Sequence, residues 1–353
     1  MRPTAAGKRI RRNAAPSQRS DVRVGPLRAI PQLLAEHGVD PLPVLASAGV
    51  APDAFGDPEN RITFSALGRL LASCVRLTEC PHFGLLVGAR FTLDSLGMLG
   101  TLMRNSPTLR DALRLATVHI DLQDRGAVAL ALDFGNSEAA LGYSLFDGTT
   151  PAADQILDGS TAIYYRLLRM LCGPSWKPTS VQLSHGRPQK TGPLHAVFGP
   201  NLEFDSRISA VVFDVRWLDH PIAGADPQTY KAILAAIALH EQRQPAPFAH
   251  KVRRAVHAMM FDASATTANL ANLFSLNERT LRRRLSAEGA TVRGLVNEVR
   301  HELAMHLLRD TQLPVTDIAM ILDYSDVTVF SRAFRNTAQT SPSEWRARMT
   351  SAA

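Results

Sequence analysis

Hydrophobic positions between residues 21 and 243 follow two different periods. Apolar residues three or four apart predict helices at four places, namely 22–48, 63–75, 152–171 and 227–244. Short apolar or alternating runs predict strands at 128–134, 140–145, 180–184 and 210–213. Gly135-Asn136-Ser137 separates the first two runs and is typical of a hairpin turn. This mixture predicts an α+β domain over residues 21–243, with a small antiparallel sheet.

The pattern changes after Pro247, where apolar residues fall almost throughout at helical spacing. Gln244-Pro245-Ala246-Pro247 interrupts the preceding helix, because proline cannot supply the backbone donor that a helix needs. We therefore place a linker at 244–250 and an all-α domain at 251–350. The first twenty residues are rich in Arg, Ala, Pro and Ser and lack periodicity. They predict a disordered basic tail, which either touches DNA or is simply solvated.

An internal repeat organises the C-terminal segment. Features of the first copy return after 48 or 49 positions, and the corresponding residues are Leu270-Ala271 and Ile318-Ala319, Leu281 and Phe330, Arg283 and Arg332, and Leu285 and Phe334. Each copy has a polar residue, Asn277 or Ser325, where a second helix needs a cap for its free amides. This order predicts two helix-turn-helix motifs, at about 267–288 and about 315–336.

A single amphipathic stripe joins the two copies and predicts a linker helix at about 291–310. Its apolar residues are Val292, Leu295, Val296, Val299, Leu303 and Leu307. A helix of about 20 residues spans roughly 30 Å, close to the roughly 34 Å between successive major-groove turns on one face of DNA. We therefore expect the two motifs to enter adjacent major grooves of one duplex.

The charge distribution agrees with binding of phosphate at the two ends of the chain. Residues 1–28 hold eight Lys or Arg and one acidic residue, and residues 251–353 hold 14 Lys or Arg and 10 Asp or Glu. Because the whole chain carries +7, the middle is mildly acidic. The three cysteines, Cys74, Cys80 and Cys172, form no zinc-binding or disulfide pattern, so we predict no metal and no cofactor.

The C-terminal motifs closely resemble the AraC/XylS family of bacterial regulators over about 85 residues. The matching segments are Leu270-Ala271, residues 277–285, Glu302-Leu303-Ala304, Asp317-Ile318-Ala319, residues 330–334 and residues 341–345. The upstream domain resembles the N-terminal domain of one branch of that family, through Pro58-x-x-Arg61-Ile62-Thr63 and several glycine-containing apolar runs, so the similarity covers roughly residues 25–350. The resemblance implies a sensing and dimerising N-terminal domain. This chain departs from the family where Ser275, Asp323 and Gln339 replace the usual glycines.

The resemblance also implies a set of DNA contacts. The base-reading positions would be Arg279, Arg283, Val327, Thr328 and Arg332. Arginine pairs bidentately with guanine, and apolar groups contact the thymine methyl. Each arginine could instead contact only phosphate or form a surface ion pair. The remaining positions are predicted to contact phosphate or cap a helix, and they are Asn277, Arg282, Arg284 and Ser325. Asp326 would cap a helix, since its charge repels phosphate.

These expectations describe a cytoplasmic, sequence-specific regulator that is nucleoid-associated when bound to promoter DNA. The resemblance favours a homodimeric activator that contacts RNA polymerase and responds to a small-molecule effector, whose binding residues the sequence does not indicate. The apolar stripe of Ile233, Leu234 and Ile237 could pair with a partner or pack on its own sheet.

No stretch predicts a membrane span. The alternatives are a regulator without a small-molecule ligand and a DNA-repair enzyme fused to the same module. No catalytic motif supports an enzyme.

Overall fold

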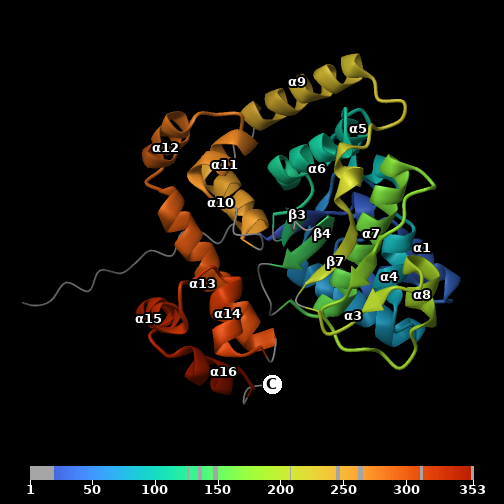
Figure 1. Ribbon diagram of the computed structural model, residues 1–353. Helices are drawn as coiled ribbons and strands as arrows, with labels where there is room; N and C mark the ends of the chain where they lie inside the picture. Colours follow the sequence, from blue (N-terminus) through green and yellow to red (C-terminus); the bar gives the residue numbers. More distant parts are fainter. Residues whose placement is uncertain are drawn as a thin grey trace, which may run out of the picture.

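The computed structural model describes residues 20–125, 127–133, 137–145, 150–206, 208–243, 247–260, 265–310 and 313–350. Figure 1 shows an N-terminal part that mixes helices with strands and a C-terminal part made only of helices among those residues. The predicted basic tail lies outside the described residues, except for Ser20, and so do residues 244–246 of the predicted linker. A helix begins at Phe248, within the stretch predicted as the linker.

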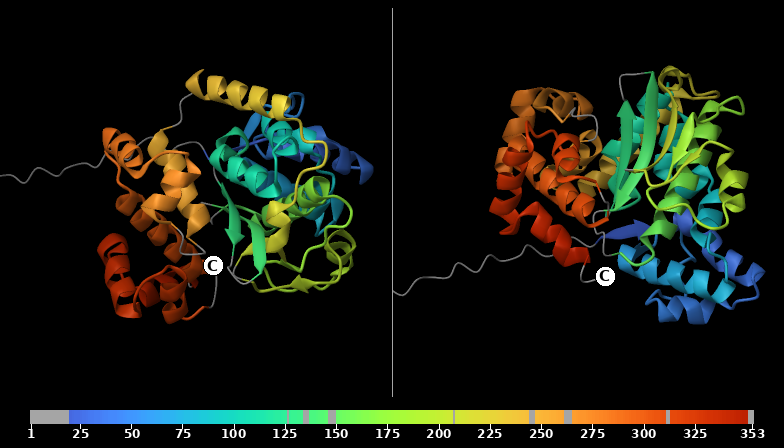
Figure 2. Two further views of the ribbon diagram at one scale, coloured as in Figure 1. Left: turned by 45° about the horizontal axis from the view of Figure 1, so that its top comes forward. Right: turned by 60° about the horizontal axis from the view of Figure 1, so that its bottom comes forward.

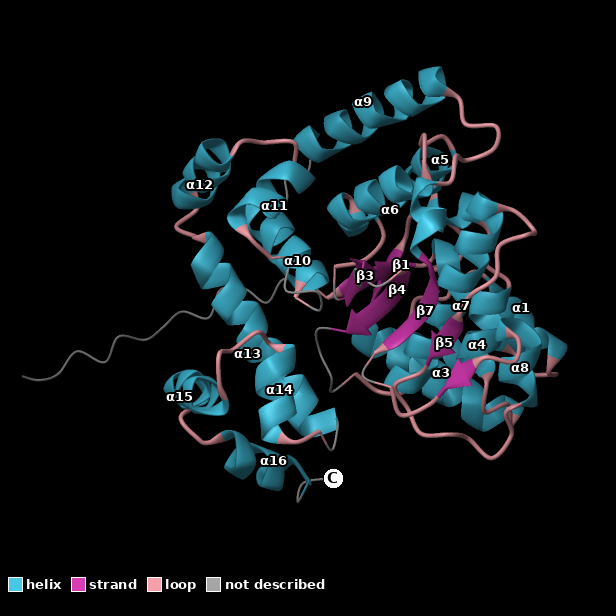
Figure 3. Cartoon of the chain, viewed as in Figure 1, coloured by secondary structure: helices cyan, strands magenta, loops and turns pink. Residues whose placement is uncertain are grey.

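A sheet of five strands lies in the N-terminal part (Figure 3), in the order β3-β4-β7-β5-β6. The strands are β3 (Ala127–Asp133), β4 (Glu138–Leu145), β5 (Ser180–Gln182), β6 (Leu202–Glu203) and β7 (Ser209–Asp214). β5 and β6 are parallel and the other pairs are antiparallel. The predicted hairpin is confirmed, because Ala129 pairs with Tyr143 and Leu132 with Ala140. Its turn residues, 134–136, lie outside the described part.

Residues 21–63 differ from the prediction, which placed helix at 22–48 and no strand. Asp21–Arg23 forms β1, which pairs antiparallel with β2 (Arg61–Thr63), and the helices are α1 (Ala29–Glu36) and α2 (Pro41–Ser47). Arg61 Nε lies 2.5 Å from Asp21 Oδ1, which locks the two strands together. Three-residue strands show no period of their own, so tertiary pairing decides them.

The helices of the N-terminal part pack on the sheet and on one another. They are α3 (Phe64–Thr78), α4 (Phe83–Ala89), α5 (Met98–Arg104), α6 (Leu109–Val118), α7 (Ala153–Cys172), α8 (Gly192–Phe198) and α9 (Pro227–Arg243). Short 3-10 turns stand at Gly25–Leu27, Leu93–Leu96, Ile120–Leu122 and Val215–Asp219. α7 packs on β4 and β7. Thr63 caps α3, where its side chain accepts a bond from the Ala66 amide at 3.1 Å.

α4 crosses α7 at the distance of backbone contact. A Cβ added at Gly84 would lie 2.0 Å from the Gln155 carbonyl oxygen, and one at Gly88 would lie 2.1 Å from that of Gly159. Glycine is therefore required at both positions for steric reasons. The sequence run Phe83-Gly84-Leu85-Leu86-Val87-Gly88 thus marks a close helix crossing.

The apolar stripe of α9 faces its own domain. Ile237 is fully buried, and Ile233 and Leu234 pack against the same core. The neighbouring element is α5 (Figure 1), so the stripe covers a helix rather than the sheet. Of the two predicted uses of this stripe, the structure therefore shows packing within the chain.

Seven helices make up the described C-terminal part. They are α10 (Phe248–Met259), α11 (Thr267–Leu273), α12 (Glu278–Ala287), α13 (Val292–Asp310), α14 (Val315–Ile321), α15 (Val327–Ala338) and α16 (Pro342–Thr350). They share one core, separate from the two cores of the N-terminal part, that includes Leu281, Leu285, Phe330 and Phe334. Within the described residues, no single helix is both long and apolar enough to cross a membrane, although α3 and α4 together form one bent candidate pair.

One arginine joins the two parts of the molecule. Arg254 of α10 is 1% exposed and reaches the segment that precedes β3. Its Nη2 lies 3.0 Å from Asp124 Oδ1 and its Nη1 lies 3.0 Å from Asp121 Oδ1. It also donates to the backbone carbonyls of Asp124 and Ala127. Both views in Figure 2 show the helical part set against one edge of the N-terminal part.

Replacing Gly88 tests the helix crossing. We expect Gly88→Ala to lower the free energy of unfolding by about 1–3 kcal/mol, because the added methyl meets backbone that cannot rotate away. Gly192→Ala is the matched control, since a Cβ there has no neighbour within 4 Å. Denaturant unfolding followed by circular dichroism measures both, and equal stability of the two variants would contradict the described crossing.

Candidate nucleic-acid interface

α11 and α12 form the first helix pair of the repeat. Asn277 caps α12 as predicted, because its Oδ1 accepts a hydrogen bond from the Thr280 amide at 2.8 Å. Leu281 and Leu285 are fully buried and hold α12 to the core, while Leu270 and Ala271 of α11 are buried beneath it. The small side chain of Ala271 lets the two helices approach. The opposite face of α12 is exposed.

α14 and α15 form the second pair, with α13 between the two pairs. Here the predicted cap is wrong by one residue. Asp326, not Ser325, caps α15, and its Oδ1 accepts bonds from the Thr328 and Val329 amides at 2.7 Å and 2.9 Å. These amides hold the pKa of the Asp326 carboxyl below its usual range. Ser325 only donates a long bond of 3.4 Å to that carboxyl. The capping role expected for Asp326 is thereby confirmed.

The three positions that lack the family's glycine all have left-handed backbone. φ is +53° at Ser275, +56° at Asp323 and +58° at Gln339. Side chains other than glycine, asparagine and aspartate pay a steric cost in this region. At the second turn, Arg300 donates to both the carbonyl and the carboxylate of Asp323, the latter at 2.7 Å. This ion pair ties α13 to the turn before α15.

The arginines of α12 differ in what they contact. Arg279 and Arg283 are exposed and form no ion pair within the described part of the chain. Arg282 pairs with Glu278 at 2.7 Å, one helical turn away. The Arg284 guanidinium lies 5.5 Å from the ring centre of Phe248 on α10. The first two are therefore the cations of this helix that are free to meet a ligand.

α15 presents a smaller and less charged surface. Val327 is 36% exposed at the start of the helix, and Thr328 and Arg332 are exposed on the same side. Arg332 forms no ion pair within the residues that the structure describes. In Figure 1, α12 and α15 lie on the side of the helical part that is farthest from the N-terminal part, while α10 lies on the near side. The surfaces of both helices are thus open.

Sequence reasoning missed a polar cleft between α13 and α15. The cleft has a volume of about 780 Å³ and is lined by residues that include Arg293, Asn297, Arg300 and Asn336. Arg293 and Asn297 are exposed and lie at the N-terminal half of α13. Both are polar residues on the solvent side of the apolar stripe of α13, so the helical period alone could have predicted their exposure. They stand between the two exposed helix faces.

A half-buried polar cluster of Arg253, His257 and Glu302 fixes α13 against α10. Glu302 of α13 accepts from His257 Nε2 at 3.1 Å and also pairs with Arg253. Burial would raise the pKa of Glu302, but the His257 hydrogen bond and the Arg253 charge outweigh burial and lower that pKa to about 2. At His257, burial disfavours the charged imidazolium and so lowers the pKa of that side chain. The cluster holds the central helix rigidly relative to the first pair.

Family comparisons agree with this geometry. Residues 38–222 match the model of the arabinose-binding domain of AraC transcription regulators, and residues 270–348 match a helix-turn-helix domain model. The chain belongs to the AraC family of transcription regulators. It is therefore a DNA-binding transcription regulator, and a role other than that of an enzyme is supported by the family.

Several curated regulators are similar along most of the chain. The ornithine utilization regulator of Pseudomonas aeruginosa is 28% identical over 92% of this chain and 96% of its own length. The regulator VirS of Mycobacterium tuberculosis is 24% identical over the same shares. Among solved structures, the regulator CdpR of Pseudomonas aeruginosa is similar with 21% identity, a TM-score of 0.43, and coverage of 86% of this chain and 96% of that one.

The strained first turn yields a stability prediction. We expect Ser275→Gly to raise the free energy of unfolding by about 1 kcal/mol, since glycine adopts φ near +53° without the steric cost. Ser286→Gly in α12 is the control and should lower stability, because glycine is unfavourable inside a helix. Chemical denaturation measures the difference, and a Ser275→Gly variant no more stable than wild type would refute the interpretation.

The pKa of Glu302 yields a prediction on pH. Because that pKa is about 2 in the folded chain and 4.5 in an unperturbed glutamate, the cluster's contribution to stability is complete above about pH 4.5 and is lost as the pH falls toward 2. Glu302→Gln should therefore make the unfolding free energy less dependent on pH in this window. Glu298→Gln, an exposed change on the same helix, serves as control. Parallel pH profiles for Glu302→Gln and wild type would contradict the assignment.

Proposed function

We propose that the chain reads promoter DNA through two helix-turn-helix units, α11–α12 and α14–α15, whose second helices enter adjacent major grooves. The observation that carries the proposal is the pair of open helix faces with arginines that have no ion-pair partner among the described residues, Arg279 and Arg283 on one and Arg332 on the other. α13 has 19 residues, so at roughly 1.5 Å each it spans about 28 Å. A rigid spacer of that length suits the spacing of adjacent grooves.

The two units contribute differently in this proposal. Arg279 and Arg283 donate to guanine edges, while Val327 and Thr328 contact thymine methyl groups and Arg332 donates to a base. Arg282 and Arg284 approach phosphates, and the contacts of these side chains with Glu278 and Phe248 restrain them in the free protein. Arg293 and Asn297 in the cleft are suited to the phosphate ridge that lies between two major grooves.

We further propose the division into a sensing and dimerisation domain at 21–243, a linker from 244, and a DNA-binding domain up to residue 350, in a cytoplasmic homodimer. Separate hydrophobic cores on either side of the linker support the division. Dimerisation would double the number of grooves read and so multiply specificity. Activation through RNA polymerase and response to a small molecule follow the family resemblance, and bound chain would associate with the nucleoid.

Two substitutions test the base-reading assignment. We expect Arg283→Ala and Arg332→Ala each to weaken binding to the cognate site by about 1–3 kcal/mol and to relax base preference there, because a bidentate contact to one base is lost. The cognate site is first identified by using the full chain to select the duplexes that it binds from a pool of random sequences. Fluorescence anisotropy then measures affinity for that site and for a scrambled duplex at one fixed salt concentration.

Two controls accompany this measurement. Arg76→Ala removes an exposed charge from the N-terminal part and should leave both affinities unchanged. Arg282→Ala should weaken specific and scrambled DNA equally, as expected of a phosphate contact. If Arg283→Ala and Arg332→Ala also weakened both duplexes equally, these arginines would not read bases.

A further inference from the structure

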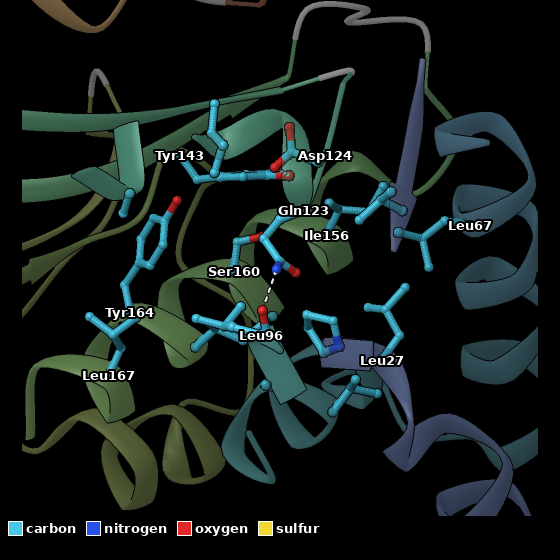
Figure 4. Close-up of a pocket in the computed structure, with 18 of the residues that line it drawn as sticks. Leu27, Leu67, Leu96, Gln123, Asp124, Tyr143, Ile156, Ser160, Tyr164 and Leu167 are labelled. Carbon is cyan, nitrogen blue, oxygen red and sulfur yellow. Dashed lines mark hydrogen bonds between the residues drawn. The ribbon is translucent and has the colours of Figure 1, made fainter. Parts of the chain in front are cut away.

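An apolar cavity that is partly open to solvent lies in the N-terminal part, between its two hydrophobic cores. Its volume is about 110 Å³, and its wall is formed mainly by apolar side chains of α3, α5, α6 and α7 (Figure 4). An apolar cavity of roughly 150 Å³ is large enough to bind benzene and stays dry when empty. This cavity is somewhat smaller, so it suits at most a single small ring or a short aliphatic chain.

Polar groups gather at one end of this cavity. Figure 4 shows Tyr143, Asp124 and Tyr164 close together there, with the Tyr164 hydroxyl directed toward the other two. The rings of Tyr143 and Tyr164 are 6.0 Å apart. The Tyr143 hydroxyl donates to Asp124 Oδ2 at 3.1 Å. The Tyr164 hydroxyl has no hydrogen-bond partner in the described part of the chain, so it is available to a ligand.

The chemistry of this end selects the kind of ligand. Asp124 is already satisfied, because it accepts from Tyr143, from the Ala127 amide and from Arg254. Gln123 is likewise occupied, since it donates to the Leu96 carbonyl and accepts from Arg23. A second charge would be buried without a partner, which is costly. An uncharged molecule with one hydroxyl or carbonyl group could instead accept a bond from Tyr164.

The same end of the cavity holds the contact between the two parts of the chain. Asp124 lines the cavity and binds Arg254 of α10, which belongs to the DNA-binding part. Tyr143 connects the cavity wall to the second oxygen of that carboxylate. A ligand that packs on the two tyrosines therefore adjoins the residues that seat α10. Filling the cavity would favour the arrangement in which Asp124 is held in place for Arg254.

We infer that this cavity is the effector site, that it takes a small uncharged ring or short chain with one hydrogen-bond acceptor, and that occupancy strengthens the docking of α10 through Asp124 and Arg254. This inference rests on the proposed effector response and names its ligand class and its route. By reciprocity, a chain that lacks the Asp124–Arg254 pair binds the ligand more weakly.

Calorimetry on the full chain tests the ligand class. Benzyl alcohol, phenol and cyclohexanone are neutral probes of suitable size, and benzoate is the charged counterpart. At least one neutral probe should bind saturably with one site per chain, and benzoate at least tenfold more weakly than benzyl alcohol. Tyr164→Phe should lower the affinity for the neutral probe several-fold. Failure of all three neutral probes to bind saturably would overturn the inference, and so would preferential binding of benzoate.

A cavity-filling variant locates the binding. Ala116 lines the cavity and Ala35 is exposed on α1, so Ala116→Leu should abolish probe binding while Ala35→Leu leaves it unchanged. Thermal unfolding checks that both variants are folded. If Ala116→Leu does not fold, Ser160→Leu fills the same cavity from α7. Undiminished binding to a folded cavity-filling variant would place the probe elsewhere and overturn the inference.

The coupling is tested with Asp124→Asn/Arg254→Met, which removes both charges of the Asp124–Arg254 pair and leaves Asp121, the other partner of Arg254, beside His250 at 3.6 Å. We expect this variant to bind the neutral probe at least fivefold more weakly. Its affinity for the selected DNA site should no longer change when the probe is added, whereas that of wild type does. Wild-type binding of the site without any response to probe would refute this inference and leave the proposed DNA reading intact. If the probe bound saturably but the chain bound no specific DNA site, only the proposed DNA reading would be refuted.

Discussion

The contact of Arg254 with Asp124 and Asp121 determines how the two parts of this regulator sit together. The guanidinium is almost wholly buried, so each of its bonds stands in a medium of low dielectric, where a missing partner is expensive. α10 is therefore held in one place against the segment that precedes β3. The Glu302 cluster then holds α13 to α10. Buried and half-buried polar contacts thus link the N-terminal part to α10, and α10 to the helix between the two helix pairs.

Elements with a long hydrophobic period could be predicted from the sequence, and most short elements could not, although the three-residue β5 lies inside the predicted strand at 180–184. α3, α7 and α9 lie where helical spacing placed them, and β3, β4 and β7 lie close to the alternating runs. β1, β2 and β6 have only two or three residues, so no period exists to detect. Their positions depend on contacts with distant residues, such as that between Asp21 and Arg61.

The candidate site shows the same division at the level of single residues. The exposure of Arg279, Arg283, Val327, Thr328 and Arg332 follows from the helical period, and the pairing of Glu278 with Arg282 follows from their four-residue spacing. The contact of Arg284 with Phe248 joins residues far apart in sequence and could not be foreseen. Ser325 and Asp326 are both good caps, and the local backbone decided between them. Asp326 is extended, with φ at −162°, as a capping residue must be.

The glycine crossing of α4 and α7 has a consequence for the adaptability of the cavity. Gly84, Gly88 and Gly159 form part of its wall, so backbone atoms in direct contact define that side. A backbone wall cannot adjust by rotation of side chains, and small substitutions there would separate the helices. Substitutions that change the ligand specificity of the cavity would therefore fall chiefly at Met103, Leu113 and Ala116, on the opposite helices α5 and α6. On the side of the helix crossing the backbone sets the shape of the cavity, and on the opposite side an exchange of side chains can change that shape.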